Sequence, residues 1–334
     1  MTTLKDVADL AGVAPITVSR VVNAPETVKL QTRQRIEEAM RTLNYAPNTA
    51  AKNLASNRTG IVVVYIPRDI DLSNPFMMHL IAGVSEVLSN RMYSMLILRD
   101  REKESMCDGY IATGLLKDEI NNFVSFASQR NRPVVLFGHT PRPDVICIDV
   151  DNVEGAFRGV DHLIKLGHSE IVMINVQEDK DYVVDRQKGY EKALEANGIQ
   201  FDMNDVVFTE NSVDGGAKAV RDIFARSRQY SAIFCATDTI AIGAVAELHR
   251  LGYKVPDQVS VVGFDGLGHH LLCSLPITTV QQPVFEVGKM LATALLNQIN
   301  NEKVDYQELV SPNFILGEST SQNSVDSRNS GFTN

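Results

Sequence analysis

The sequence lacks the long apolar runs that cross membranes, since no segment approaches the roughly 18 consecutive apolar residues that a spanning helix needs. It begins Met-Thr-Thr-Leu-Lys-Asp, which is not the pattern of a secretory signal peptide. Its four cysteines are widely spaced in apolar segments, which is typical of buried reduced thiols. We therefore expect a cytoplasmic protein with no membrane partner.

Signatures of common enzymes are also absent from the sequence. There is no G-x-G-x-x-G, no G-x-S-x-G and no P-loop. Asp149 and Asp151 lie two residues apart, so on one strand they face the same side, without the asymmetry of a glycosidase acid–base pair. The adjacent His269 and His270 have no cysteine or third ligand nearby. These absences predict no catalysis, no metal and no cofactor.

The N-terminal segment carries the most distinctive pattern that is present. Apolar residues at helical spacing form one stripe, Leu4, Val7, Ala8 and Ala11, and a second, Val18, Val21 and Val22. Gly12 separates them, and glycine ends a helix without strain. A third amphipathic segment, Gln31–Leu43, is expected to bury Ile36, Ala39, Met40 and Leu43. Three short helices with a tight turn predict a helix-turn-helix head that presents its second helix to DNA.

The distribution of charge supports this prediction. The 334 residues carry a net charge of −9, which is unusual for a DNA-binding protein. Residues 1–58 nevertheless hold eight Lys and Arg against five Asp and Glu, a net +3, which leaves −12 for the remainder. A basic head on an acidic body is expected of a specific DNA-binding protein. Because one head is only modestly positive, we expect a dimer that contacts two half-sites.

After Gly60 the pattern changes to alternating strands and helices, which predicts an α/β fold with parallel sheets covered on both faces. The predicted strands are Ile61–Ile66, Ser94–Leu98, Gly109–Ala112, Val134–Phe137, Ile171–Ile174, Ala232–Cys235 and Val259–Val262, with a last one near Phe314–Gly317. Two sheets with a cleft between them would bind a ligand at the carboxyl ends of the strands. We expect one lobe from residues 61–149 plus 281–310 and another from 151–278 plus 311–319.

Eight motifs in order give the chain a resemblance to the LacI/GalR family of bacterial transcription regulators. They read LKDVADLAGVAPITVSRVVN, LNYAPNTAAKNLASNRTG, DNVEGA, HLIKLGH, RQKGYEKAL, ATDTIAIGA, VSVVGFD and PITTVQQP, and they run from Leu4 to about Ser319. The resemblance implies a helix-turn-helix domain at 1–47 and a hinge helix and linker at 48–60, while the Ser- and Asn-rich composition of 321–334 predicts a disordered tail. Between them, residues 61–320 would form a two-lobed, type I periplasmic-binding-protein-like body that binds effector and dimerises.

Candidate DNA contacts lie on the second helix and in the predicted hinge. Arg20 can read guanine through a bidentate hydrogen bond, although a phosphate contact remains an alternative. Pro15 and Ile16 can touch only thymine methyl groups, whereas Thr17, Ser19 and Asn23 suit phosphates. The resemblance places Asn48, Ala51 and Leu54 on DNA, with Leu54 as a wedge in the minor groove. Packing of Leu54 on its own body is the alternative.

Candidate effector contacts follow from the resemblance as well. Arg186 and Asp265 match the family's ligand-binding arginine and aspartate, and together they suit a polyhydroxylated ligand. A purely structural salt bridge is the alternative. The other matching positions are Phe76, Thr113, Thr237, Asp238 and Gln282, of which Asp238 equally suits a helix cap. Gly138, His139 and Asn211 depart from the pattern: relatives often carry an acidic residue after the strand at 134–137 and some have an aromatic wall near 211.

One further departure lies in the first lobe. Only residues 99–108 separate two strands, whereas a parallel crossover needs a dozen or more residues and the resemblance implies a helix there. Either this crossover is a stretched loop or the lobe is rearranged. The sequence thus predicts a dimeric or tetrameric repressor of a carbohydrate-use operon, controlled by a sugar or sugar phosphate. The alternative is a regulator that has lost effector binding because the first lobe is shortened.

Overall fold

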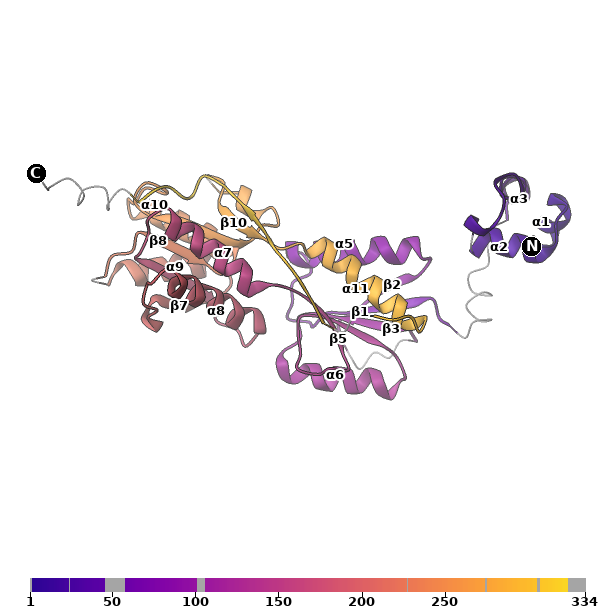
Figure 1. Ribbon diagram of the computed structural model, residues 1–334, viewed down its shortest axis with the longest axis horizontal. Coiled ribbons are helices and arrows are strands. Elements are labelled where there is room, and N and C mark those ends of the chain that lie inside the picture. The colour runs from indigo at the N-terminus through magenta and orange to yellow at the C-terminus, as the bar shows by residue number, and fades with distance from the viewer. Residues whose placement is uncertain are drawn as a thin grey trace, which may run out of the picture. The chain divides into compact units, whose positions relative to one another are not determined.

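The computed structural model describes residues 2–23, 25–45, 58–100, 106–226, 228–273, 275–304 and 307–323. The chain divides into two compact units, Met1–Gly60 and Ile61–Asn334, each with its own hydrophobic core (Figure 1). The predicted hinge helix and its residues Asn48, Ala51 and Leu54 lie outside the described residues.

The described part of the first unit is helical. It comprises α1 (Leu4–Ala11), α2 (Pro15–Asn23), the short 3-10 helix η1 (Pro25–Thr27) and α3 (Leu30–Thr42). Thr3 caps α1 in a reciprocal capping box with Asp6, and Gly12 ends the helix at φ 60°, as predicted. The core holds Val7, Val18 and Ile36 with no exposed surface. Ile36 and Ala39 are buried on α3, but Met40 and Leu43 are only half-buried, so the predicted apolar face of this helix is correct only at its centre.

The second unit contains two six-stranded sheets that are parallel except where β10 pairs with β12. The first sheet has the order β11-β5-β4-β3-β1-β2. Its strands are β1 (Ile61–Tyr65), β2 (Ser94–Leu98), β3 (Gly109–Ala112), β4 (Val134–Phe137), β5 (Ile146–Val150) and β11 (Gln307–Val310). The second sheet has the order β12-β10-β9-β8-β6-β7. Its strands are β6 (Ile171–Val176), β7 (Val206–Thr209), β8 (Ala232–Cys235), β9 (Ser260–Asp265), β10 (Thr278–Gln281) and β12 (Asn313–Ile315).

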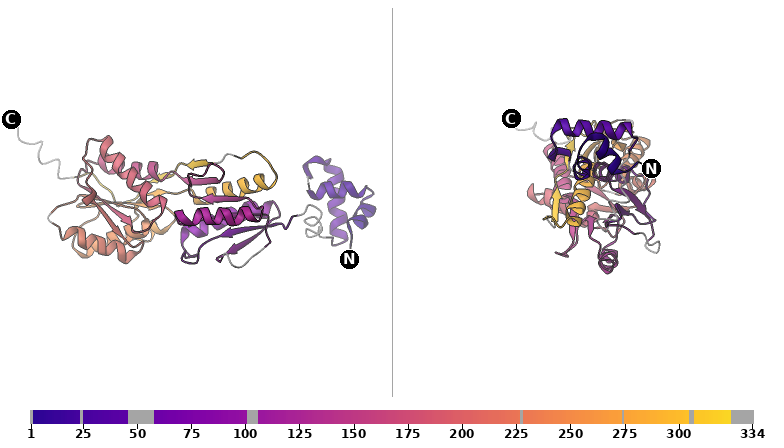
Figure 2. Two further views of the ribbon diagram at one scale, coloured as in Figure 1. Left: turned by 90° about the horizontal axis from the view of Figure 1, so that it is seen from below. Right: turned by 90° about the vertical axis from the view of Figure 1, so that its right-hand side faces the viewer.

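Helices cover both faces of each sheet (Figure 2). In the first lobe, α5 (Pro75–Asn90) and α11 (Val284–Ile299) pack side by side on one face, and α6 (Lys117–Gln129) covers the other (Figure 1). The helices of the second lobe are α7 (Asn152–Lys165), α8 (Asp181–Ala196), α9 (Val213–Phe224) and α10 (Asp238–Arg250), together with the short η2 (Met203–Asp205) and η3 (His269–Leu271). Here α7 pairs with α8 and α9 with α10. Val262 faces α7 while its neighbour Gly263 faces α10, so the two pairs lie on opposite faces.

The chain passes between the two lobes at three short connections, between β5 and α7, between β10 and α11, and between β11 and β12. At each of them only one or two residues separate the flanking elements: Asp151, Gln282–Pro283 and Ser311–Pro312. The lobes are therefore joined by three short connections.

The short crossover between β2 and β3 leaves the strand order intact. β1 lies between the two strands and pairs with both in parallel, so the lobe is not rearranged. The described residues 99–100 and 106–108 form no helix. Aromatic rings cover β1 and β3 on this face, since Phe123 on α6 has its ring centroid 4.6 Å from Tyr65 and 5.7 Å from Tyr110. The edge strand β2 is less well covered there, because Leu96 remains 37% exposed. Arg99 then binds the carbonyls of Pro67, Arg68 and Ile70, which ties the crossover to the loop after β1.

Two predictions need correction here. The tail was expected to be disordered from Ser321, but Ser321 and Asn323 make hydrogen bonds to Ser260, Pro256 and Gly167; residues 324–334 lie outside the described part. Of the four cysteines, three are buried, but Cys273 is only half-buried. Within the residues that the structure describes, no helix combines the length and apolar character required to span a membrane.

Candidate functional site: the cavity between the lobes and the exposed head helix

A cavity of about 320 Å³ lies between the two lobes, where the carboxyl ends of the parallel strands meet. The loops after β1, β3 and β4 line it from the first lobe, and those after β6, β7, β8 and β9 line it from the second. Among the predicted effector contacts, those that line the cavity are Phe76, Thr113, Arg186, Thr237, Asp265 and Gln282.

Arg186 is the buried centre of the second-lobe wall. Its Nε donates to Oδ1 of Asn152 at 3.0 Å, and its Nη1 donates to the carbonyl of Ala236 and lies 3.5 Å from Oδ1 of Asp265. The guanidinium also stacks over the ring of Phe264, with 3.7 Å from Cζ to the centroid. Burial lowers the pKa of Arg186, while the carboxylate of Asp265 acts in the opposite direction. Its donors are thus held rigidly at the edge of the cavity.

Asp265 ends β9 in a backbone conformation that a non-glycine residue rarely adopts, with φ 121°. Backbone strain of this kind typically persists where the surrounding structure determines it and occurs often at ligand sites. Oδ1 of Asp265 accepts a hydrogen bond of 2.7 Å from Nε2 of Gln282. Burial raises the pKa of Asp265, although Arg186 and Gln282 favour the charged form. Arg186, Asp265 and Gln282 form one polar group that combines donors and acceptors.

The prediction that Asp238 lines the cavity is wrong. Its carboxylate is buried behind the wall, where it accepts hydrogen bonds from the hydroxyl of Thr279 at 2.6 Å and the amide of Gly266 at 2.8 Å. Burial and the nearby charge of Asp265 raise the pKa of Asp238 to about 8. Nor does Asp238 cap α10: Thr237 is the N-cap residue, accepting from the amide of Ile240 and donating to Asn211. The signal for Asp238 was ambiguous because both residues follow β8.

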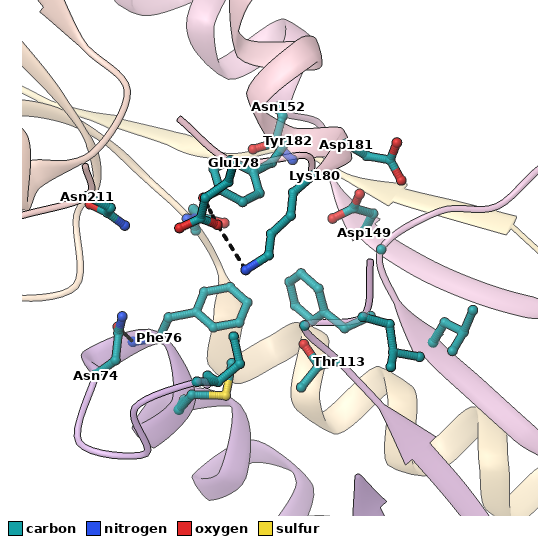
Figure 3. A pocket seen from close by; sticks show the side chains of 18 of the residues that line it. Asn74, Phe76, Thr113, Asp149, Asn152, Glu178, Lys180, Asp181, Tyr182 and Asn211 are labelled. Carbon is teal, nitrogen blue, oxygen red and sulfur yellow. Dashed lines mark hydrogen bonds and ion pairs between the residues drawn. The ribbon is translucent and has the colours of Figure 1, made fainter. Parts of the chain in front are cut away.

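The first lobe contributes an aromatic wall. Asn74 caps α5 by accepting from the amide of Phe76 at 2.9 Å, which fixes Phe76 at the cavity (Figure 3). The rings of Phe76 and Phe137 lie edge to face with centroids 4.9 Å apart. Thr113 lies at the cavity too, directly after β3. Aromatic faces beside hydroxyl and amide groups suit the mixed surface of a sugar ring.

His139 links the two lobes, and sequence reasoning had noted it only as a departure from a pattern. Its Nδ1 lies 3.2 Å from Oδ2 of Asp149 in the first lobe, and its Nε2 lies 3.8 Å from Asp181 and from Asp185 on α8. The hydrogen bond with Asp149 raises the pKa of His139, and burial raises the pKa of Asp149.

Sequence reasoning also missed Asn152, Glu178, Lys180 and Tyr182, which line the second-lobe side (Figure 3). All four follow a strand end or begin a helix, and that position is the signal that would have found them. Within the described residues, no three His, Cys, Asp or Glu side chains are grouped so as to hold a metal ion.

The predicted DNA contacts of the head lie along α2. Val18 and Val21 point into the core, whereas Pro15, Ile16 and Arg20 are exposed, with Ile16 at 61%. Thr17 and Ser19 are half-buried beside them, and Asn23 is the last residue of the helix. The helix therefore presents a face of mixed apolar and basic character away from its own core.

A helix-turn-helix head joined to a two-lobed body with a ligand-sized cavity is the architecture of a ligand-responsive transcription regulator. The comparisons give the particular family. The model for bacterial regulatory proteins of the lacI family matches residues 3–48, and the model for the periplasmic binding protein-like domain matches residues 160–320.

Similar proteins extend this match to nearly the whole chain. The HTH-type transcriptional regulator YvdE of Bacillus subtilis (strain 168) is 35% identical over 322 residues, which cover 96% of this chain and 100% of that protein. The HTH-type transcriptional repressor CytR of Escherichia coli (strain K12) is 30% identical over 90% of this chain and 91% of that one. The structure of the transcriptional regulator CelR in complex with cellobiose is 28% identical, with a TM-score of 0.73 over 96% and 100% of the two chains. The chain belongs to the lacI family of bacterial regulatory proteins, and the predicted family and two-lobed fold are confirmed.

Proposed function

We propose that this member of the lacI family represses a carbohydrate-use operon in the cytoplasm, as a dimer that binds operator DNA, and that it is not an enzyme. In this proposal residues 1–47 bind DNA, 48–60 connect, and 61–320 bind the effector and dimerise. The effector is a polyhydroxylated small molecule held between the lobes. The observation that carries the proposal is the joint presence of the exposed α2 face and the cavity around Arg186 in one chain.

Arg186, Asp265 and Gln282 support the effector part. Their hydrogen-bonding groups converge at the cavity from α8, β9 and the connection after β10. A donor beside carboxylate and amide acceptors can bind vicinal hydroxyls in a way that a single charge does not. If the buried, charged Arg186 only joined two elements, the desolvation of its charge would cost free energy that a pair of apolar residues would not. The cellobiose named in the CelR structure is a ligand of this chemical class.

Loss of effector binding is the weaker alternative. It rested on the shortened crossover between β2 and β3, but the first lobe still supplies Phe76, Thr113 and Phe137 to the cavity wall. The tie from Arg99 to the carbonyls of Pro67, Arg68 and Ile70 holds the loop after β1 in place without the missing helix.

The DNA part is tested with sites selected from random duplexes by the full chain. Binding to a selected site should weaken steeply with salt, since two heads release counterions from several phosphates. Arg20→Ala should lose about 1–3 kcal/mol of discrimination at one base pair per half-site. Equal weakening on every sequence would reassign Arg20 to a phosphate contact, and a salt-independent affinity would contradict the role of the head.

The effector part is tested by titrating the full chain, with and without its site DNA, against uncharged mono- and disaccharides that include cellobiose. A true effector must change DNA affinity by the same factor by which DNA changes effector affinity. Calorimetry measures how DNA changes the affinity for the effector, and DNA titration measures how the effector changes the affinity for DNA. If no sugar bound while DNA binding was normal, the effector assignment would fail.

A further inference from the structure

The cavity wall is strongly acidic. Its described lining residues include six carboxylates, those of Asp69, Asp71, Asp149, Glu178, Asp181 and Asp265. Against them stand two permanent cations, Lys180 and Arg186, and the titratable His139. With histidine neutral, the formal charge of the wall is −4, so an anionic ligand would enter against the field of the wall.

Both permanent cations are already engaged. The guanidinium of Arg186 is bound to Asn152, the Ala236 carbonyl and Asp265. Lys180 extends into the cavity, where its Nζ lies 2.9 Å from Oε2 of Glu178 (Figure 3). The Glu178 carboxylate, whose side chain is 34% exposed, also accepts a hydrogen bond of 3.1 Å on the same oxygen from the hydroxyl of Tyr182. The one lysine in the described lining is therefore neutralised by a positioned carboxylate.

Helix N-termini act in the opposite direction but are too weak to reverse the sign. α5, α7, α8 and α10 all begin near residues of the lining, and each N-terminus is equivalent to roughly +0.5 of a charge. Three of them already carry an acidic residue in the first turn, namely Glu154, Asp181 and Asp238.

We propose that Glu178 determines ligand charge: by neutralising Lys180, it makes the cavity select an uncharged hydroxyl-rich ligand over the phosphate ester of the same ligand. The proposal rests on the proposed function for the site and narrows its effector class. Carboxylates only accept hydrogen bonds, so they match hydroxyl donors and leave the oxygens of a phosphate without partners. A phosphate would need the Lys180 ammonium, which Glu178 occupies.

The test compares sugars with their phosphate esters by calorimetry on the full chain. In the unaltered protein each ester should bind at least about tenfold more weakly than its parent sugar. Glu178→Gln frees Lys180 and removes one negative charge, so it should reduce or reverse this preference by about tenfold or more. The double variant E178Q/K180Q has the same net charge as the unaltered protein but no lysine at this position, and should exclude the esters again. Glu195→Gln, an exposed acid at the far end of α8, controls for charge alone and should change nothing.

A second experiment uses inorganic phosphate as the probe and needs no identified effector. Phosphate should stabilise E178Q beyond a chloride control of equal ionic strength, but neither the unaltered protein nor E178Q/K180Q. Tighter binding of esters than of parent sugars by the unaltered protein, or an unchanged preference in E178Q, would overturn the role of Glu178. Failure of all uncharged sugars would instead overturn the proposed effector class, which is a separate result.

Discussion

The two lobes add their strands in the same order, so that β1 to β5 correspond to β6 to β10, yet they cover one equivalent face differently. In the second lobe the crossover from β7 to β8 carries α9, which packs against α10. In the first lobe the equivalent crossover is confined to residues 99–108, and aromatic rings around α6 cover β1 and β3 but leave Leu96 of β2 exposed. The comparison teaches that a parallel sheet tolerates loss of a covering helix at its edge: large side chains of the next helix cover the inner strands, and the edge strand β2 stays partly exposed.

The lobes also divide the cavity chemistry between them. The second lobe supplies the buried polar centre around Arg186, and the first supplies Phe76, Phe137 and the half-exposed His139. A buried charge network depends on every one of its members, whereas an aromatic wall loses contacts gradually. Substitutions in the polar wall of the second lobe should therefore have larger effects than substitutions in the aromatic wall of the first.

The largest effect is expected at Arg186. Arg186→Met removes the cation from Asp265 and leaves the Ala236 carbonyl without this donor, which should lower the free energy of unfolding by about 3–5 kcal/mol. Adding Asp265→Asn removes the uncompensated charge and should restore part of the loss. Urea unfolding of the two single variants and the double variant measures the coupling between them. Additive losses would show that Arg186 and Asp265 do not act as a pair.

The aromatic cover of the first lobe should give an intermediate effect. Phe123 is fully buried and its ring lies near those of Tyr65, Tyr110 and Phe126, so Phe123→Leu should lower the free energy of unfolding by about 1–2 kcal/mol. The matched control is Phe224→Leu on α9, where the half-buried ring packs on Tyr253 at 4.7 Å. The control should lose less. An equal or larger loss at Phe224 would contradict the idea that the first lobe depends more on the rings around α6 than the second lobe depends on those of α9.

The smallest effect concerns pH and His139. Because Asp149 raises the pKa of His139, the stabilising contribution of the charged ring is fully present below its unfolded pKa and is lost as pH rises through the raised folded value. His139→Gln should remove this part of the pH dependence near neutrality, an effect below about 1 kcal/mol because the ring is half-exposed. Thermal unfolding of both proteins between mildly acidic and mildly alkaline pH measures it. Parallel profiles would exclude a contribution from His139.

Much of the fold could be predicted because apolar runs mark its strands, most of which are buried on both faces; the edge strand β2 is a partly exposed exception. The predicted Ser94–Leu98, Gly109–Ala112, Val134–Phe137 and Ala232–Cys235 agree with β2, β3, β4 and β8. A strand with polar residues was missed: β10, whose Thr278 and Thr279 are buried but hydrogen-bonded. Asp149 does lie on a strand, β5, but Asp151 lies beyond it as the N-cap of α7. Hydrophobic periodicity does not identify a buried polar side chain, because the hydrogen-bond partner that allows its burial is brought near only by the fold.

The candidate site shows the same division. The motif resemblance brought Arg186, Asp265 and Gln282 together, and they do meet at the cavity. It failed for Asp238, because two consecutive residues after one strand point in different directions and only the backbone decides which reaches the cavity. It gave no role to His139, whose partners come from β5 and α8 and are distant in sequence.

The three connections between the lobes have a mechanical consequence. Asp151, Gln282–Pro283 and Ser311–Pro312 leave almost no slack between the elements that they join. Connections this short bend more readily than they stretch, so we expect them to suppress sliding and separation of the lobes and to permit a change in the angle between them. Binding of a ligand in the cavity would then change one quantity, the angle between the two lobes, whichever atoms of the ligand make contact. A distant part of the molecule can respond to that angle alone.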